Sequence, residues 1–179
     1  MMDLKLILTL IALPFLISFG LAGLSAAPWV PTKPKQTRRL IDKLDLRDGM
    51  TIYDLGCGSG TVLFAIARHN PHIKLVGYEI SLLPYLIACA RKLVGGAKYK
   101  NVSIKFANLF KQDLSDGDLI FVFLLDKCYP RLIDKLRREI KPNATVVVEA
   151  WPLPGIRPSK VDQDDGLLSV FFYKGENFS

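Results

Sequence analysis

The sequence has few cysteines and no metal-binding pattern. Only three of its 179 residues are cysteine, namely Cys57, Cys89 and Cys128, and no two of them form a Cys-x-x-Cys pair. Small disulfide-rich domains and structural zinc sites both need closely spaced or numerous cysteines. The sequence therefore argues against a disulfide framework, predicts no metal site and favours a reducing compartment.

Acidic residues are scarcer than basic ones. The chain carries 24 lysines and arginines against 17 aspartates and glutamates, a net charge of +7 at pH 7. Such a balance favours anionic partners, either a membrane surface or a nucleic acid. Because no zinc pattern and no basic motif interleaved with aromatic residues is present, the sequence predicts no nucleic-acid partner. Residues 91–105 hold five cations and no acid, which makes this segment the best candidate for contact with an acidic surface.

No charged residue occurs between positions 6 and 32. The apolar part, residues 6–27, is about 33 Å long as a helix and matches a bilayer core of about 30 Å. It is preceded by Asp3 and Lys5 and followed by Lys33, Lys35, Arg38 and Arg39. We therefore expect residues 1–27 to form a single-pass membrane anchor, with the rest of the chain on the cytoplasmic side, or the matrix side in a mitochondrion. A cleaved signal peptide is the alternative, because "LSAAP" is rich in small residues.

The chain after the apolar segment alternates between helical and extended patterns. Three prolines in "PWVPTKPK" predict an extended linker over residues 28–36, followed by one domain over residues 37–179. We expect helices at 37–46 (with Thr37 as N-cap), 61–69, 82–94 and 130–140, and strands at 50–55, 74–79, 102–107, 118–125, 144–150 and 167–173. This alternation, without internal repeats, predicts an α/β fold: a doubly wound, mostly parallel, Rossmann-like sheet with helices on both faces.

The loop after the first strand lacks the GxGxxG spacing of dinucleotide-binding sites. The stretch "TIYDLGCGSGTVL" at residues 51–63 instead spaces Gly56, Gly58 and Gly60 as GxGxG. Asp54 stands two residues before the first glycine, where its charge would repel a pyrophosphate. A nicotinamide oxidoreductase is therefore disfavoured, and the loop suits a ligand that presents a cation.

S-adenosylmethionine is such a ligand, because it carries an ammonium and a sulfonium group and no phosphate. Asp54 is expected to hold the ammonium, while the three glycines let the backbone approach the ligand closely. Glu79, at the end of the second strand, is expected to accept hydrogen bonds from both ribose hydroxyls. Asn108, after the third strand, is expected to pair with the adenine. The further predicted cofactor-site residues are Cys57, which fills a small slot in the loop, and Ile80 and Leu109, which sandwich the base.

The motif "DLGCGSG", together with Glu79 and Asn108, resembles the class I, Rossmann-like S-adenosylmethionine-dependent methyltransferases over roughly residues 37–173. A narrower resemblance rests on the apolar N-terminus, on "PWVPT" and on "WPLPG" after the fifth strand. This arrangement is similar to the mitochondrial lysine methyltransferases that modify the ATP synthase c-ring protein and the adenine nucleotide translocase, and to their prokaryotic relatives. Their aromatic-x-Pro-Ser/Thr element is matched by Trp29, Pro31 and Thr32. The chain is shorter than the larger members after the fifth strand, so its final hairpin is expected to be truncated.

The resemblance implies methyl transfer to a lysine at the carboxyl ends of the strands. The residues expected to line the acceptor pocket are Thr32, Leu125, Asp126, Trp151 and Pro152. Asp126 either receives a proton, orients the amine or serves only as a helix-start carboxylate. A membrane tether favours an acceptor on a membrane-associated protein. The alternatives are methylation of a lipid, a quinone or another small molecule, and a cofactor-binding assembly factor without catalysis.

Overall fold

A computed structural model describes residues 32–178 without a break, and before them only residues 3, 5, 6, 8, 9, 12, 13, 16 and 20. Most of the predicted anchor at 1–27, and the linker up to Pro31 with Trp29, therefore lie outside the described residues. Within the described part of the chain, no helix is both long enough and apolar enough to cross a bilayer.

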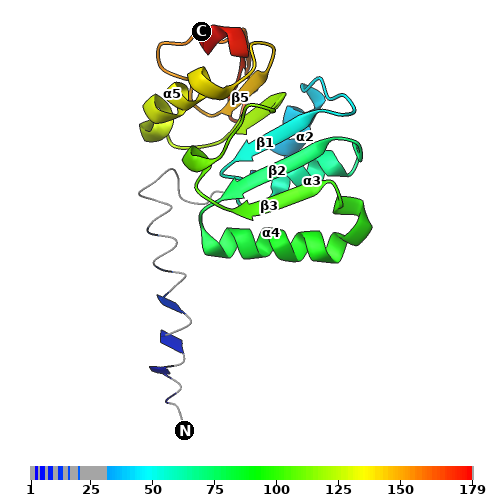
Figure 1. The fold of residues 1–179 in the computed structure, drawn as a ribbon, viewed down its shortest axis with the longest axis vertical. Coiled ribbons are helices and arrows are strands. Elements are labelled where there is room, and N and C mark those ends of the chain that lie inside the picture. Colours follow the sequence, from blue (N-terminus) through cyan, green and yellow to red (C-terminus); the bar gives the residue numbers. More distant parts are fainter. Residues whose placement is uncertain are drawn as a thin grey trace.

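The domain is built on one seven-stranded sheet with the order β3-β2-β1-β4-β5-β7-β6 (Figure 1). Strands β1 to β5 pair in parallel, whereas β7 runs antiparallel to both β5 and β6. The strands are β1 (Thr51–Leu55), β2 (Lys74–Glu79), β3 (Val102–Phe106), β4 (Leu119–Val122), β5 (Thr145–Glu149), β6 (Lys160–Asp162) and β7 (Val170–Lys174). The predicted mostly parallel sheet is confirmed.

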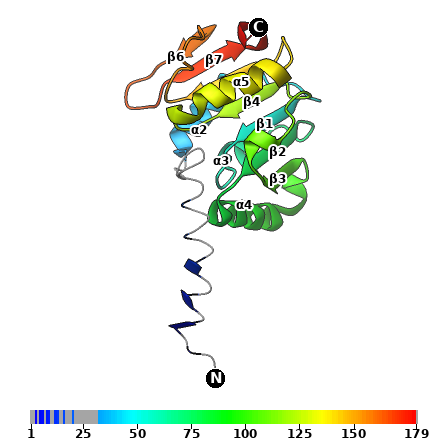
Figure 2. The ribbon, with the colours of Figure 1, turned by 60° about the vertical axis from the view of Figure 1, so that its left-hand side comes forward.

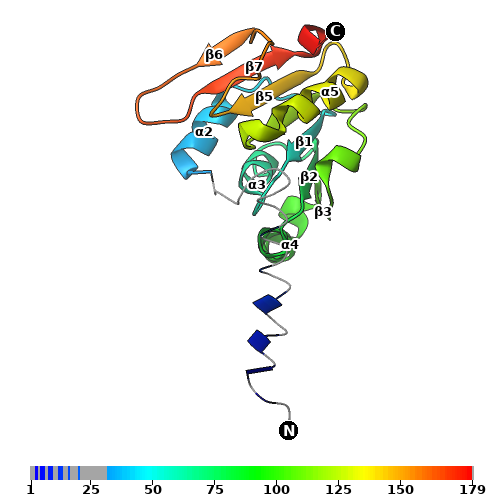
Figure 3. The ribbon, with the colours of Figure 1, turned by 90° about the vertical axis from the view of Figure 1, so that its left-hand side faces the viewer.

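Helices cover both faces of this sheet (Figures 2 and 3). Three of them, α2 (Pro34–Asp42), α3 (Thr61–Ala67) and α4 (Leu82–Gly95), lie on one face. The fourth, α5 (Tyr129–Glu139), lies on the other. The short 3₁₀ helices are η1 (Gly96–Tyr99), η2 (Leu109–Lys111), η3 (Asp126–Cys128) and η4 (Gly175–Phe178).

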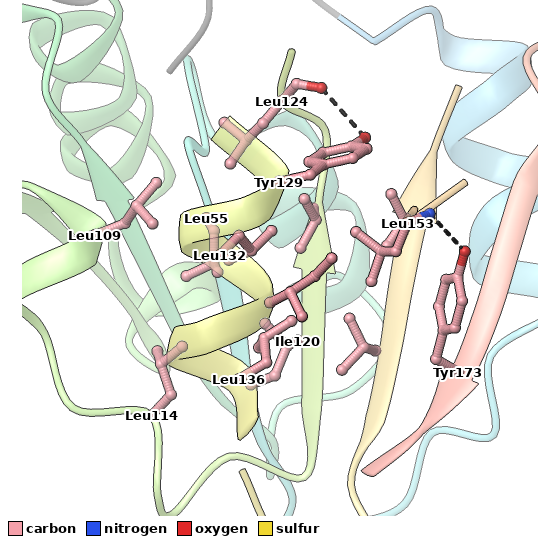
Figure 4. Close-up of a cluster of buried hydrophobic side chains, with 14 of the residues drawn as sticks. Leu55, Leu109, Leu114, Ile120, Leu124, Tyr129, Leu132, Leu136, Leu153 and Tyr173 are labelled. Atoms are coloured by element: carbon pink, nitrogen blue, oxygen red, sulfur yellow. Dashed lines mark hydrogen bonds between the residues drawn. The ribbon is translucent and has the colours of Figure 1, made fainter. Parts of the chain in front are cut away.

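The core lies in two apolar clusters, one on each side of the sheet. Strand β4 shows why, because its four residues are all buried and alternate between the two sides. Ile120 packs with Leu132 and Leu136 of α5 (Figure 4), whereas Phe121 packs into the cluster under α2, α3 and α4. Apolar side chains on both faces make β4 a central strand, as its continuous hydrophobic run predicts.

The first helix of the domain differs from the prediction. It begins at Pro34 and ends at Asp42, so the linker ends at residue 33, and Lys33 is the N-cap. Proline at the first helical position has the φ value that a helix needs and no N–H that could be left unbonded. The prediction of Thr37 as N-cap was wrong: its hydroxyl lies in the first turn and donates to the carbonyl oxygen of Lys33 at 3.2 Å.

The end of the chain also differs. The strand expected at 118–125 stops at Val122, and the last strand lies at Val170–Lys174 rather than 167–173. Strand β6 was not predicted, because it has only three residues and follows a segment that contains prolines. It pairs with β7, so the chain forms a short final hairpin in which Asp162 lies opposite Val170.

Candidate active site

The glycine-rich loop joins β1 to α3 and depends on a left-handed backbone. Gly56, Gly58 and Gly60 have φ values of +83°, +54° and +74°, a region that side-chain-bearing residues rarely adopt. Gly60 is also the N-cap of α3, and a Cβ there would lie 2.7 Å from Cε2 of Phe64. The loop therefore needs glycine both for its conformation and for its contact with the helix.

Asp54 lies in β1 directly before this loop and is 3 % exposed. Nothing in the described part of the chain donates a hydrogen bond to its carboxyl group. Burial, together with the nearby carboxylates Glu79 and Glu149, raises the pKa of Asp54 to about 8. A buried carboxyl without a donor or a cation is stabilised as a carboxylate by any ligand that brings a positive charge.

Glu79 ends β2 and is also buried. Its Oε2 accepts a hydrogen bond from the backbone N–H of Gly58 at 2.8 Å, and its Oε1 accepts one from the backbone N–H of Ser81 at 2.6 Å. The carboxylate thus fixes the glycine loop to the start of α4, a structural role that the sequence did not predict. Each carboxylate oxygen has a second lone pair, so Glu79 keeps the capacity to accept ribose hydroxyls.

Asn108, Leu109 and Ile80 surround the ends of β2 and β3 as predicted, but two of them have further roles. The side-chain oxygen of Asn108 accepts a hydrogen bond from the N–H of Phe110 at 3.0 Å and so caps η2. Leu109 is buried in the core cluster on the α5 side (Figure 4). The contacts of these residues with adenine stay predictions.

Cys57 fills a small slot, as the sequence analysis expected. A Cβ at Gly77 of the neighbouring strand would lie 2.6 Å from the Cys57 sulfur. Burial raises the pKa of this thiol well above its usual range, so Cys57 is kept protonated and unreactive.

The predicted acceptor residues lie in two loops, one after β4 and one after β5. Tyr129, at the start of α5, joins these loops: its hydroxyl oxygen is 3.3 Å from the carbonyl oxygens of both Leu124 and Trp151 (Figure 4). Leu125 is half-buried, whereas Asp126, Trp151 and Pro152 are exposed. Thr32 is half-buried before α2, and within residues 32–178 no hydrogen bond joins it to either loop.

Glu149 is a site residue that the sequence analysis missed. It ends β5, is 0 % exposed, and neither carboxylate oxygen has a hydrogen-bond partner in the described structure. Burial raises its pKa to about 7, although Gln36 and Arg39 of α2 act in the opposite direction. The next residue, Ala150, has a φ of +79°, a strained conformation for a residue with a side chain. The signal for this site was an acidic residue in the otherwise apolar strand "TVVVEA".

Three buried carboxyl groups thus lie on one face at the carboxyl end of the sheet. Side chains alternate along a strand, so Asp54, Glu79 and Glu149 share the face of their strands that points toward α2, α3 and α4. Ligands of open α/β sheets bind at this end. Within the described part of the chain, no three histidine, cysteine, aspartate or glutamate side chains are grouped to hold a metal ion.

This arrangement fits S-adenosylmethionine better than a dinucleotide. Asp54 offers a buried carboxyl without a partner to an ammonium group, and the glycine loop lets a ligand approach the backbone. Glu79 stands one strand away, where a ribose would follow. A pyrophosphate in the same place would face three acidic groups.

Comparison with known proteins agrees with this geometry. Residues 54–160 match the family model described as the ANTKMT methyltransferase domain. The chain is 31% identical over 147 residues to a protein-lysine N-methyltransferase of Saccharolobus islandicus, and the match covers 82% of this chain and 91% of that protein. It is 27% identical over 157 residues to the human lysine N-methyltransferase of the ATP synthase c-ring protein, covering 84% of this chain but only 63% of the human protein.

Among solved structures, the chain is similar to an RNA methyltransferase from Salinibacter ruber in complex with S-adenosyl-L-homocysteine. The TM-score is 0.75 and the identity 23%, and the match covers 81% of this chain and 93% of the other. At this identity the likeness shows the shared Rossmann-like methyltransferase fold.

Proposed function

The chain belongs to the family of ANTKMT methyltransferase domains, and we propose that it transfers a methyl group from S-adenosylmethionine to a lysine side chain of a membrane-associated protein. The observation that carries this proposal is the 31% identity to an archaeal protein-lysine N-methyltransferase over nine-tenths of that protein. The buried, unpartnered carboxyl of Asp54 beside the glycine loop supports the choice of a cationic methyl donor.

The cofactor, when bound, supplies an electrophilic methyl group on its sulfonium. Asp54 would hold the cofactor's ammonium, Glu79 the ribose hydroxyls, and the loop at Gly56–Gly60 the amino-acid moiety. Aligning two reactants and excluding water is worth about 7–11 kcal/mol in favourable cases. The protein therefore needs no strong base if it positions the acceptor well.

The acceptor amine must lose a proton before it can attack, and a free lysine has a pKa of about 10.4. An apolar pocket lowers this value because it disfavours the ammonium form. Leu125 and Trp151, in the two loops joined by Tyr129, are the residues that we assign to such a pocket. Asp126 is exposed at the start of η3, where it can receive or direct a proton.

The membrane part of the proposal rests on the sequence. Residues 6–27 are uncharged and apolar, and four cations follow between residues 33 and 39. We propose that this segment anchors the domain on the cytoplasmic or matrix side. A tether would raise the effective concentration of acceptors in the same membrane.

Transfer of a labelled methyl group tests the proposal. The full chain is incubated with methyl-labelled S-adenosylmethionine and membranes, and the label is then measured separately in the protein and organic phases. We expect label in protein, on a lysine that mass spectrometry identifies. Gly58→Arg and Glu79→Ala should abolish transfer, whereas Asp134→Asn, at an exposed residue of α5, should leave it unchanged.

Label in the organic phase alone would replace lysine by a lipid or another small molecule as the acceptor. Binding of S-adenosylhomocysteine without transfer to any membrane component would favour a non-catalytic assembly factor.

A further inference from the structure

Helix α4 exposes an apolar stripe along its whole length. Leu93 and Val94 are 82% and 89% exposed, and Leu83 and Leu86 are about half exposed. With Ala90, these residues fall on one side of the helix, because they are spaced at three, four and seven positions. In Figures 1 and 3, α4 forms one margin of the domain, away from α5 and the β6–β7 hairpin. The stripe therefore faces outward, and no described part of the chain covers it.

The chain around this stripe is positively charged. Between Ile80 and Gln112 there is no aspartate or glutamate, and there are six cations. They are Arg91, Lys92, Lys98, Lys100, Lys105 and Lys111. Within residues 32–178 none of these six forms an ion pair. Arg91 is engaged by the carbonyl oxygen of Ser59 at 2.7 Å, but Lys98, Lys100, Lys105 and Lys111 are exposed.

We propose that the α4 surface, defined as Leu83, Leu86, Ala90, Leu93 and Val94 with the lysines at 98, 100 and 105, docks on a membrane that contains anionic lipids. Exposed aliphatic side chains flanked by lysines are the pattern of a helix that lies in the plane of a bilayer interface. The aliphatic residues enter the headgroup region, and the lysines lie at the level of the lipid phosphates.

Charge decides between this partner and a second copy of the chain. Two α4 surfaces in contact would bring two sets of lysines together without an acid between them, which opposes self-association. An anionic bilayer instead supplies the opposite charge and an apolar interior at the same time. The docking uses no residue of the cofactor site and does not depend on the N-terminal segment.

Docking also fixes the orientation of the domain. Phe106 is 52% exposed at the carboxyl end of β3 and packs against Tyr85 of α4 with ring centroids 5.3 Å apart. The stripe thus continues to the edge of the sheet where the site lies. With α4 on the bilayer, that edge opens close to the membrane surface.

Hydrogen exchange of the full chain on vesicles tests the docking. The vesicles contain either phosphatidylcholine alone or phosphatidylcholine with phosphatidylglycerol, so any N-terminal anchoring occurs on both. We expect amide exchange in residues 82–95 to slow by about tenfold on the anionic vesicles relative to the neutral ones. Exchange in α5 serves as the internal reference and should not change.

Two pairs of substitutions separate the apolar and the electrostatic parts. Leu86→Gln with Leu93→Gln, and Lys98→Glu with Lys100→Glu, should each return the exchange of α4 to the rate on neutral vesicles. Arg137→Glu with Arg138→Glu, on exposed positions of α5, is the matched control and should have no effect. Equal α4 exchange on the two vesicle types would overturn the proposal. So would slowing that follows protein concentration without vesicles, which would indicate a dimer through α4.

Discussion

Asp54 shows how one buried residue can select a cofactor. The free protein offers it neither a hydrogen-bond donor nor a cation within the described chain, and its pKa is raised to about 8. A ligand with an ammonium group supplies the missing charge, whereas a diphosphate would add to the repulsion. Selectivity thus follows from a carboxyl that is unfavourable until the ligand binds.

We therefore predict that S-adenosylhomocysteine binding depends on pH through Asp54. Below about pH 8 the free carboxyl is protonated, while the bound ammonium needs the carboxylate, so binding must release a proton. Affinity should rise by about tenfold per pH unit up to about pH 8 and then level off. Calorimetry near pH 7 in buffers of different ionisation enthalpy measures the proton released.

The neutral variant Asp54→Asn should weaken binding and remove the proton release, whereas Asp134→Asn should do neither. An affinity that falls as the pH rises would show that Asp54 does not meet the ammonium.

Glu149 should make the folded protein less stable at higher pH. Its pKa is raised from 4.5 to about 7 by burial, so the folded state binds its proton more strongly than the unfolded state. The contribution of Glu149 is therefore most favourable below about pH 4.5 and is lost as the pH rises to about 7. Glu149→Gln should raise the free energy of unfolding at pH 8 by about 2 kcal/mol, measured by urea unfolding.

At pH 4 the difference between Glu149→Gln and the parent chain should vanish. Glu176→Gln, on an exposed residue, should change neither value. A parent chain that gains stability between pH 5 and 7 would instead show an ionised, paired Glu149.

The sequence predicted the cofactor-side residues better than the acceptor side. Asp54 and Glu79 stand out because they flank a recognisable glycine spacing. Glu149 has no such motif beside it, and its burial depends on α2, which is more than a hundred residues earlier in the chain. The capping role of the Asn108 side chain was likewise invisible, because it depends on the local turn.

At the scale of elements, α2 holds the final hairpin in place. Its Arg39 forms an ion pair with Asp162 of β6 at 2.8 Å, and the two side chains are only 10% and 15% exposed. Arg39 and Gln36 also donate hydrogen bonds to the carbonyl oxygen of Leu168, each at 3.1 Å. The helix before the sheet is thus joined to the last two strands.

Asp162→Asn should therefore destabilise the protein. Loss of the carboxylate leaves a mostly buried guanidinium without its ion-pair partner, and we expect a cost of about 1–3 kcal/mol in urea unfolding. Asp134→Asn is the control, because Asp134 and Arg137 are 3.9 Å apart and more than half exposed, so its cost should be below about 0.5 kcal/mol. Equal costs for the two variants would contradict the proposed role of α2.

Element types were predictable because the periodicity of this chain is strong, but some boundaries were not. Pro34 looked like a helix breaker from the linker side and is in fact the first residue of α2. Strand β6 has exposed residues and becomes a strand only because β7 offers it a partner. Such elements are created by tertiary pairing, which a local pattern does not contain.

For the whole molecule, a parallel sheet with a site at its carboxyl end predicts strong stabilisation by the correct ligand. At about 100 times its dissociation constant, S-adenosylhomocysteine should add about 2.7 kcal/mol of stability. For a chain of this length that raises the melting temperature by about 5–10 °C. NAD at the same concentration should leave it unchanged, and Glu79→Ala should abolish the effect of S-adenosylhomocysteine. A shift with NAD alone would reverse the assignment of the cofactor.

The overall class of fold followed from the alternation of strands and helices, whereas the strand order did not. Nothing in the local sequence of β7 shows that it enters between β5 and β6 in the opposite direction. That insertion depends on cross-strand pairs such as Val148 with Phe171, which lie far apart along the chain.

The reversed direction of β7 also bears on how such a domain can diversify. Because β7 is antiparallel, the turn before it, residues 163–169, reaches the same edge of the sheet as the ends of the five parallel strands, and the N–H of Ala150 donates to the carbonyl oxygen of Ser169 there at 2.9 Å. This turn includes the exposed acids Asp164 and Asp165. Insertions or new charges in it would alter what approaches the acceptor side while the buried strands stay as they are, so evolution, or a protein engineer, can change target choice here at little cost to folding.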